Sequence, residues 1–63
     1  MPFVHIEWVE GRSLEQKREL TKRITDAVAE VAGIPGDRVH VFIRDMKQDE
    51  YGVGGELIVD KKK

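Results

Sequence analysis

The chain has 63 residues, no cysteine and a formal net charge of −1 at pH 7. A domain this small buries only about 60% of the surface that its unfolded chain exposes, so it usually needs disulfides, a metal or partner subunits. The lack of cysteine excludes disulfides and zinc–thiolate sites, and the charge argues against a dedicated nucleic-acid-binding or membrane-surface protein. We therefore expect one domain, residues 1–63, that is stabilised by self-association.

The sequence has no signal for a metal, a membrane or secretion. His5 and His40 are the only histidines, and neither belongs to an HExxH-type motif, so no metal site is expected. There is neither an apolar run of about 18 residues nor a secretory signal, which predicts a cytoplasmic protein that does not enter a membrane. Residues 61–63 form the only basic run and are expected to be a flexible, solvated tail.

Residues 2–9 alternate between apolar and polar side chains, which is typical of a β-strand with one covered face. The apolar set on that face is Val4, Ile6 and Trp8. Proline has no backbone N–H, so Pro2 fits only at the first position of such a strand.

Ser13 is predicted to begin a long helix. Its hydroxyl can cap the first free N–H groups, and Gln16 completes a capping box. Apolar residues then follow at helical spacing and form one stripe: Leu20, Ile24, Ala27, Val28 and Val31. Gly33 and Pro35 supply stop signals, so the helix is expected over residues 14–32.

Residues 39–44 predict a second strand. One face is expected to carry Val39, Val41 and Ile43, and the other Arg38, His40, Phe42 and Arg44. Strand, helix and strand form a β-α-β unit with parallel strands and a right-handed crossover. The single helix covers one sheet face, so other copies of the chain are expected to cover the face with Phe42.

Residues 51–59 are predicted to form a short hairpin that turns at glycines. The expected fold is thus α+β: a single β-α-β unit with a short C-terminal β-hairpin, assembled as an oligomer.

Two residues have more than a structural interpretation. Removal of Met1 would expose the secondary amine of Pro2, and an apolar wall or a nearby cation would lower its pKa toward that of an effective general base. Arg12 precedes the helix, where the positive end of the helix dipole disfavours a cation, so it suggests a forked grip on a carboxylate. Each residue alone also has a simpler explanation. Pro2 can merely follow the start codon, and Arg12 can be a solvated loop arginine.

Other chemistries have weaker support. Ser13 is the only serine and is explained as a helix cap, which argues against a serine hydrolase. The glycines of residues 52–55 do not match the GxGxxG spacing of a nucleotide site. The carboxylates show no spacing that singles out a catalytic pair.

Taken together, the chain resembles the 4-oxalocrotonate tautomerase family over nearly its whole length. The resemblance rests on Pro2 behind the initiator, residues 10–13 (EGRS), residues 15–17 (EQK) and residues 51–56 (YGVGGE). It implies a β-α-β subunit with a C-terminal hairpin, in a homohexamer (a trimer of dimers) with active sites between subunits. It also implies isomerisation of unsaturated 2-oxo acids through dienols, without cofactor or metal, in the breakdown of aromatic compounds.

The family pattern assigns roles to five residues of this chain. Pro2 would shuttle the proton, and Arg12 of a neighbouring subunit would bind the distal carboxylate of the substrate. Tyr51 stands where the family usually has phenylalanine, as the aromatic wall near the proline. Val9 and Val53 fall at positions that line the same pocket.

His40 departs from the family pattern, because it aligns with a second arginine that holds the 1-carboxylate and polarises the 2-oxygen. A neutral imidazole cannot make a forked, charged contact, and loss of such a donor can cost about 3–4 kcal/mol of transition-state stabilisation. We hypothesise that Arg38 partly substitutes, since it lies about 6.6 Å from His40 along one face of the predicted strand. Arg44 lies about 13 Å away on that face and is the weaker candidate.

Several alternatives stay open. His40 is equally well explained as an interface residue with satisfied hydrogen bonds. A monocarboxylate enol such as phenylenolpyruvate, rather than 2-hydroxymuconate, makes fewer demands on the missing arginine. The chain could also be an oligomeric scaffold with weak or lost catalysis, or could perform dehalogenation or decarboxylation with the same proline. Nucleic-acid binding has only the basic run of residues 61–63 to support it.

Overall fold

The structure, a computed structural model, describes residues 1–61. Its elements, in chain order, are β1 (Phe3–Val9), α1 (Leu14–Ala32), the 3₁₀-helix η1 (Gly36–Arg38), β2 (His40–Met46), β3 (Gly52–Val53), β4 (Glu56–Leu57) and α2 (Ile58–Lys61). The rest of the predicted flexible tail, residues 62–63, lies outside the described residues. None of the helices within residues 1–61 has the length and apolar character needed to cross a membrane.

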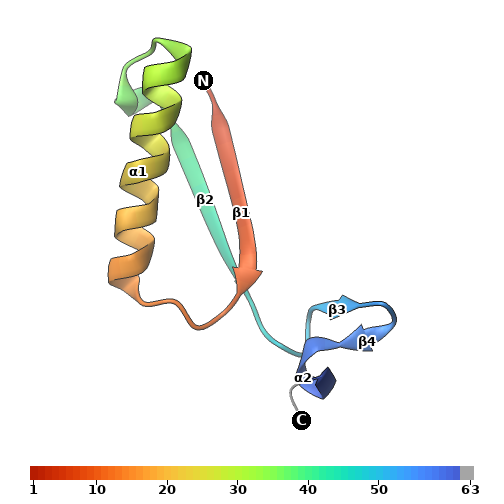
Figure 1. Cartoon of the computed structure of the whole chain (residues 1–63). Coiled ribbons are helices and arrows are strands. Elements are labelled where there is room, and N and C mark those ends of the chain that lie inside the picture. Colours follow the sequence, from red (N-terminus) through yellow and green to blue (C-terminus); the bar gives the residue numbers. More distant parts are fainter. Residues whose placement is uncertain (62–63) are drawn as a thin grey trace.

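The two long strands form the predicted parallel pair, with α1 as the connection between them (Figure 1). The register runs from Phe3 opposite His40 to Val9 opposite Met46. In Figure 1, α1 covers one face of this sheet, and no element of residues 1–61 covers the other. The predicted β-α-β unit is therefore confirmed.

The helix begins and ends where the sequence predicts. The Ser13 hydroxyl accepts a hydrogen bond of 3.1 Å from the Gln16 N–H, and the Gln16 side chain accepts one of 2.9 Å from the Ser13 N–H. Both halves of the capping box are thus present. Gly33 ends the helix in the left-handed conformation, at φ 71° and ψ 38°, where glycine has no Cβ penalty.

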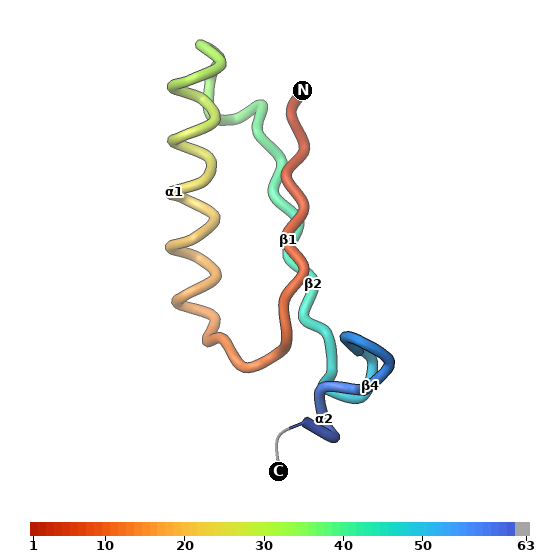
Figure 2. The backbone as a smooth tube through the Cα atoms, turned by 45° about the vertical axis from the view of Figure 1, so that its right-hand side comes forward, coloured from red at the N-terminus to blue at the C-terminus, as the bar shows by residue number. Residues whose placement is uncertain are grey.

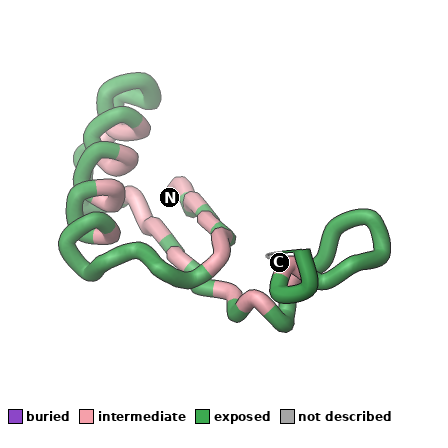
Figure 3. The backbone as a smooth tube through the Cα atoms, turned by 60° about the horizontal axis from the view of Figure 1, so that its bottom comes forward, coloured by how far each residue is buried: buried purple, intermediate pink, exposed green. Residues whose placement is uncertain are grey.

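The predicted apolar stripe of α1 is only partly correct. Leu20, Ile24 and Val28 are half-buried against the sheet, whereas Ala27 is exposed and Val31 is 88% exposed. Figure 3 shows half-buried positions along one side of α1 and exposed positions elsewhere on it. Two strands lie only about 4.8 Å apart, while a helix with its side chains is about 10 Å wide, so this narrow sheet leaves one edge of the stripe uncovered.

The second strand begins later than predicted. Residue 39 follows η1, a turn closed by hydrogen bonds of 3.1 Å from the Arg38 N–H to the Pro35 carbonyl and from the Val39 N–H to the Gly36 carbonyl. Arg38 therefore ends a 3₁₀ turn, and the prediction that it shares a strand face with His40 is wrong. The strand starts at His40, whose N–H donates to the Pro2 carbonyl.

The C-terminal hairpin is present but shorter than predicted. Gly54 and Gly55 form its turn with φ of 67° and 89°, values that side-chain-bearing residues rarely adopt. The expected strand through residue 59 is wrong, because residues 58–61 form α2. The Ile58 N–H still bonds to the Tyr51 carbonyl at 2.8 Å in the register of the hairpin, whereas the Val59 N–H bonds to the Gln48 carbonyl at 3.1 Å, outside that register.

No described residue is buried, so residues 1–61 have no closed core (Figure 3). The chain exposes 4992 Å², whereas a compact protein of this mass exposes about 4100 Å². Its radius of gyration is 15.0 Å, against about 11 Å for a compact chain of this length. Figure 2 shows the hairpin lying beyond the ends of β1 and β2, away from α1.

Aromatic rings occupy the sheet face opposite α1. Phe3 and Phe42 are 57% and 48% exposed, and their centroids lie 6.1 Å apart. The Phe3 ring stacks on His40 at 5.0 Å, and the Phe42 ring stacks on His5 at 4.8 Å. The open face with Phe42, expected from the sequence, is therefore present, and its apolar area is the kind of surface that partner subunits cover.

Candidate functional site

Pro2 and His40 lie side by side at one end of the sheet. Pro2 is half-buried just before β1, and its carbonyl accepts the His40 N–H at 3.0 Å. The His40 Nε2 atom is shielded from solvent and has no hydrogen-bond partner within residues 1–61. A shielded nitrogen without a hydrogen bond lowers the stability of the fold. His40 Nε2 is therefore suited to form a hydrogen bond with a ligand or a second chain at this end of the sheet.

Arg38 lies close to the same end. It is exposed at the last position of η1, two residues before His40. Within the described part of the chain it forms no ion pair. The structure therefore leaves a cation near Pro2 and His40, although on a turn and not on the strand.

Arg12 lies at the opposite end, in the connection between β1 and α1. Its Nη1 donates to the Val9 carbonyl at 2.7 Å, and its guanidinium carbon lies 4.8 Å from the centroid of the Trp8 ring. The carbonyl and the ring face both attract the cation and fix its position. Its remaining N–H groups have no partner among the described residues.

Beneath Arg12, Asp45 joins the strands to the helix. Asp45 Oδ1 accepts the indole N–H of Trp8 at 2.6 Å, and Oδ2 pairs with the Lys17 ammonium. The hydrogen bond from Lys17, followed by that from Trp8, holds the pKa of the Asp45 carboxyl below its usual value.

Tyr51 and Val9 share a shallow hollow at this end. It measures about 310 Å³ and is lined by Glu7, Trp8, Val9, Met46 and Tyr51. Val53, on β3, is 46% exposed and does not line this hollow. The predicted apolar wall is thus only partly assembled within one chain.

The predicted site residues therefore fall into two groups at opposite ends of the sheet. Pro2, His40 and Arg38 are near the start of β1, and Val9, Arg12 and Tyr51 are near its end (Figure 1). The seven-residue strand separates them by about 20 Å. Since one chain cannot bring Pro2 and Arg12 to a common small ligand, a site that uses both must form between chains.

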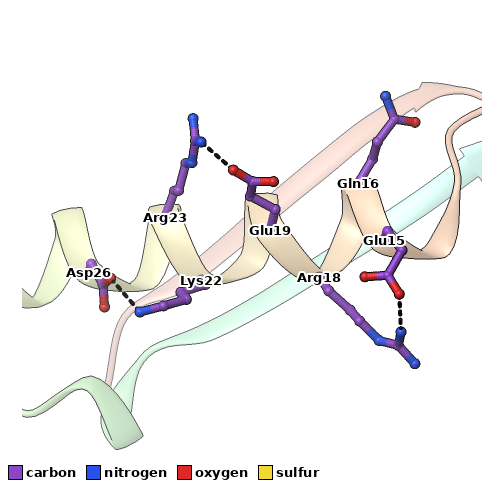
Figure 4. A pocket seen from close by; sticks show the side chains of 7 residues that line it. All are labelled: Glu15, Gln16, Arg18, Glu19, Lys22, Arg23 and Asp26. Carbon is purple, nitrogen blue, oxygen red and sulfur yellow. Dashed lines mark hydrogen bonds and ion pairs between the residues drawn. The ribbon is translucent and has the colours of Figure 1, made fainter.

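A second hollow, on the outer face of α1, is a poor candidate (Figure 4). Its lining contains three ion pairs along the helix: Arg18 with Glu15, Lys22 with Asp26 and Arg23 with Glu19. Exposed pairs at this spacing are typical of a solvated helix face. Residues 1–61 also contain no group of three or more His, Cys, Asp or Glu side chains that could hold a metal ion.

The cluster of Trp8, Asp45 and Lys17 was missed by the sequence analysis. One signal was available: with period two, Asp45 falls on the same face as Val41 and Ile43, where an acid needs a partner. Which partner it has depends on strand register, and the register pairs Trp8 with Asp45.

Comparison with known protein families gives one consistent result. The family model described as tautomerase enzyme matches residues 2–61. A probable tautomerase of Halalkalibacterium halodurans is 46% identical over 61 residues, which cover 97% of this chain and 100% of that protein. The 2-hydroxymuconate tautomerase of Bacillus subtilis is 42% identical over 60 residues, or 95% of this chain and 97% of that enzyme.

Solved structures agree with these relatives. The crystal structure of a 4-oxalocrotonate tautomerase homologue matches with a TM-score of 0.92 and 33% identity over 100% of both chains. A chain of the heterohexamer 4-oxalocrotonate tautomerase from Chloroflexus aurantiacus matches with a TM-score of 0.87 and 32% identity, over 95% of this chain and 97% of that one. The resemblance noted from the sequence is thereby confirmed: the chain belongs to the tautomerase family and is an isomerase with the fold of the 4-oxalocrotonate tautomerases.

Proposed function

We propose that this chain is a cofactor-independent tautomerase of enols and dienols of 2-oxo acids, such as 2-hydroxymuconate, with the N-terminal amine of Pro2 as the proton carrier. The observation that carries the proposal is the placement of Pro2 and Arg12 at opposite ends of β1, beside an open aromatic sheet face. That placement favours a site composed of two chains.

Pro2 would act after removal of Met1, which is 75% exposed at the end of the chain. The free secondary amine removes a proton from the dienol and returns it to a carbon further along the conjugated chain, so the reaction needs no other reagent. An apolar wall around the amine in the assembled protein would disfavour its charged form and so lower its pKa. An amine with a pKa near neutrality is an effective general base.

Arg12 of a neighbouring subunit would bind the distal carboxylate and draw electron density along the conjugated chain. Its free N–H groups can form a forked pair with a carboxylate. Tyr51, Val9 and Val53 would form the apolar wall around the amine, and the second chain would complete this wall.

His40 and Arg38 would face the 1-carboxylate and the 2-oxygen. The unpartnered His40 Nε2 supports a single hydrogen bond to the substrate. Arg38, two residues away, forms no ion pair within residues 1–61, which supports a contribution to carboxylate binding.

For the assembly we favour a homohexamer, a trimer of dimers. The exposed Phe3 and Phe42 and the lack of buried residues within 1–61 support burial of the sheet face between copies. The heterohexameric relative is a precedent for six chains of this fold. Breakdown of aromatic compounds in the cytoplasm is the setting that this chemistry suggests.

The test is ultraviolet-monitored ketonisation of 2-hydroxymuconate and phenylenolpyruvate, with protein whose mass confirms loss of Met1. Turnover that disappears in Pro2→Ala, while the assembly stays intact, would support the amine as base. Absence of turnover of both enols by correctly trimmed, assembled protein would overturn the proposal. The result would then favour a scaffold of the same fold, for which His40 at the arginine position is the supporting observation.

A further inference from the structure

The charged residues around Arg12 are unequal in number, with more cations than carboxylates. Two cations, Arg12 and Lys17, lie near the one carboxylate of Asp45. Lys17 forms the ion pair, although an arginine is the better partner of a carboxylate in a forked geometry. Arg12 instead rests on the Trp8 ring and the Val9 carbonyl.

Both oxygens of Asp45 are occupied. Trp8 donates to Oδ1 and Lys17 pairs with Oδ2, and the side chains of Lys17 and Asp45 are only 29% and 31% exposed. The pair is thus less exposed than the ion pairs on the outer face of α1, so it is screened less than they are. Each oxygen of the carboxylate thus already has one donor, and the charge that would attract Arg12 is largely neutralised by Lys17.

The same contacts fix the surface on which Arg12 lies. Trp8 and Asp45 are opposite each other in the strand register, so the hydrogen bond between them holds the indole in one orientation. The guanidinium lies over that ring with one N–H on Val9 and the rest unpartnered within residues 1–61.

We propose that Trp8, Asp45 and Lys17 are positioning residues that keep the Arg12 guanidinium free and oriented for a substrate carboxylate, and so set the preference for dicarboxylate over monocarboxylate enols. Lys17 is the most important of the three, because it forms the ion pair with Asp45 that Arg12 would otherwise form. This inference rests on the proposed function, in which Arg12 binds the distal carboxylate.

The test is a pair of variants. Together they distinguish a new ion pair between Asp45 and Arg12 from a general loss of structure. In Lys17→Met, Asp45 loses its partner and pairs with Arg12, so KM for 2-hydroxymuconate rises about tenfold, which corresponds to one lost charged contact. KM for phenylenolpyruvate, which has no distal carboxylate, stays unchanged. In Lys17→Met/Asp45→Asn the capturing charge is gone, and KM for 2-hydroxymuconate returns to within about twofold of the wild type.

A structural role predicts the opposite pattern. If Lys17 only held α1 to the sheet, the double variant would be at least as impaired as Lys17→Met, with both substrates, and the inference would fail. Lys17→Arg, which keeps the ion pair, should behave like the wild type. Lys22→Met and Lys22→Met/Asp26→Asn are matched controls, since that pair is also on α1 but lies on its outer face.

A spectroscopic readout does not depend on turnover. Trp8 is the only tryptophan, so its indole N–H gives a single NMR signal. In the wild type, titration with adipate, an unreactive dicarboxylate, should shift this signal, whereas hexanoate should not. The adipate shift should vanish in Lys17→Met and return in the double variant; equal shifts in all three proteins would overturn the inference.

Failure of the proposed function gives a different result. If Arg12→Ala leaves KM for 2-hydroxymuconate unchanged, Arg12 does not bind the distal carboxylate and the proposed role of Arg12 fails. If Arg12→Ala raises KM but Lys17→Met does not, only the positioning inference fails.

Discussion

The backbone N–H of His40 donates a hydrogen bond of 3.0 Å to the carbonyl of Pro2. The start of β2 is thereby fixed beside the residue that we propose as the base. Because this contact involves only main-chain atoms, it can form with any residue at position 40 except proline, which lacks the N–H. Substitutions there can test substrate contacts without moving Pro2.

His40→Arg should raise kcat/KM for 2-hydroxymuconate by at least tenfold. The guanidinium would supply a forked, permanently charged contact to the 1-carboxylate and the 2-oxygen, and one such donor is worth about 10²–10³ in rate at other oxyanion sites. Ketonisation kinetics measure the effect. His40→Gln, which is neutral and cannot form the charged contact, is the control, and an equal gain in that variant would contradict the explanation.

Arg38→Ala should lower kcat/KM about tenfold for both enols, because both carry the 1-carboxylate that Arg38 is proposed to bind. Arg44→Ala, which removes a cation from the sheet face further along β2, is the matched control and should have little effect. Unchanged turnover of 2-hydroxymuconate by Arg38→Ala would show that Arg38 does not replace the missing arginine.

Phe42→Glu should prevent assembly. The Phe42 ring is 48% exposed on the open sheet face, and burying a phenylalanine side chain contributes about 1.5–3 kcal/mol. A carboxylate at an apolar interface would add an uncompensated charge to this loss. Size-exclusion chromatography with light scattering would detect smaller species, whereas Phe42→Leu should assemble; assembled Phe42→Glu would exclude this face as the interface.

Asp45→Asn should lower thermal stability at pH 7 but not at strongly acidic pH. The pKa of the Asp45 carboxyl is lower in the folded chain than in the unfolded chain, first because of Lys17 and then because of Trp8. Its stabilisation is therefore present above the unfolded pKa, about 3.9, and is lost as pH falls through the folded pKa. Melting curves from pH 7 to pH 2 for the wild type and variant should converge.

The control for this experiment is Glu19→Gln, which removes the exposed pair with Arg23 and should change stability little at any pH. A difference between wild type and Asp45→Asn that stayed constant down to pH 2 would mean that shape, and not charge, explains the loss.

Gly54→Ala should destabilise the hairpin by about 1–2 kcal/mol, the cost of a left-handed conformation for a residue with a Cβ. Gly54 has φ 67° and open space around it, so only backbone strain opposes the substitution. Gly36→Ala is the matched control, because its Cβ would make an ordinary contact of 3.5 Å with Thr25. Equal melting temperatures for Gly54→Ala and the wild type would contradict this explanation.

The local features of the fold could be predicted from the sequence because each depends on a few adjacent residues. The Ser13 and Gln16 capping box and Gly33 gave both ends of α1, and Gly54 and Gly55 gave the hairpin turn. The 3₁₀ turn that removes Arg38 from β2 was not predicted, because it depends on hydrogen bonds after Pro35 that compete with strand pairing.

The candidate site was predictable only as far as the resemblance extends. Family motifs singled out Pro2, Arg12 and Tyr51, whose roles stay predictions. The contact between Trp8 and Asp45 depends on strand register, which alternation does not give. The exposure of Val31 was missed for a similar reason, since helical spacing does not tell how wide the sheet beneath the helix is.

The absence of any buried side chain in residues 1–61 has a consequence for how this enzyme behaves in dilute solution. When folding and association are one equilibrium, the melting temperature rises with the concentration of chains. Specific activity should then fall below a threshold enzyme concentration, after a lag set by subunit dissociation. For such a protein, the concentration of the chain in the cell determines what fraction of it is folded, assembled and active.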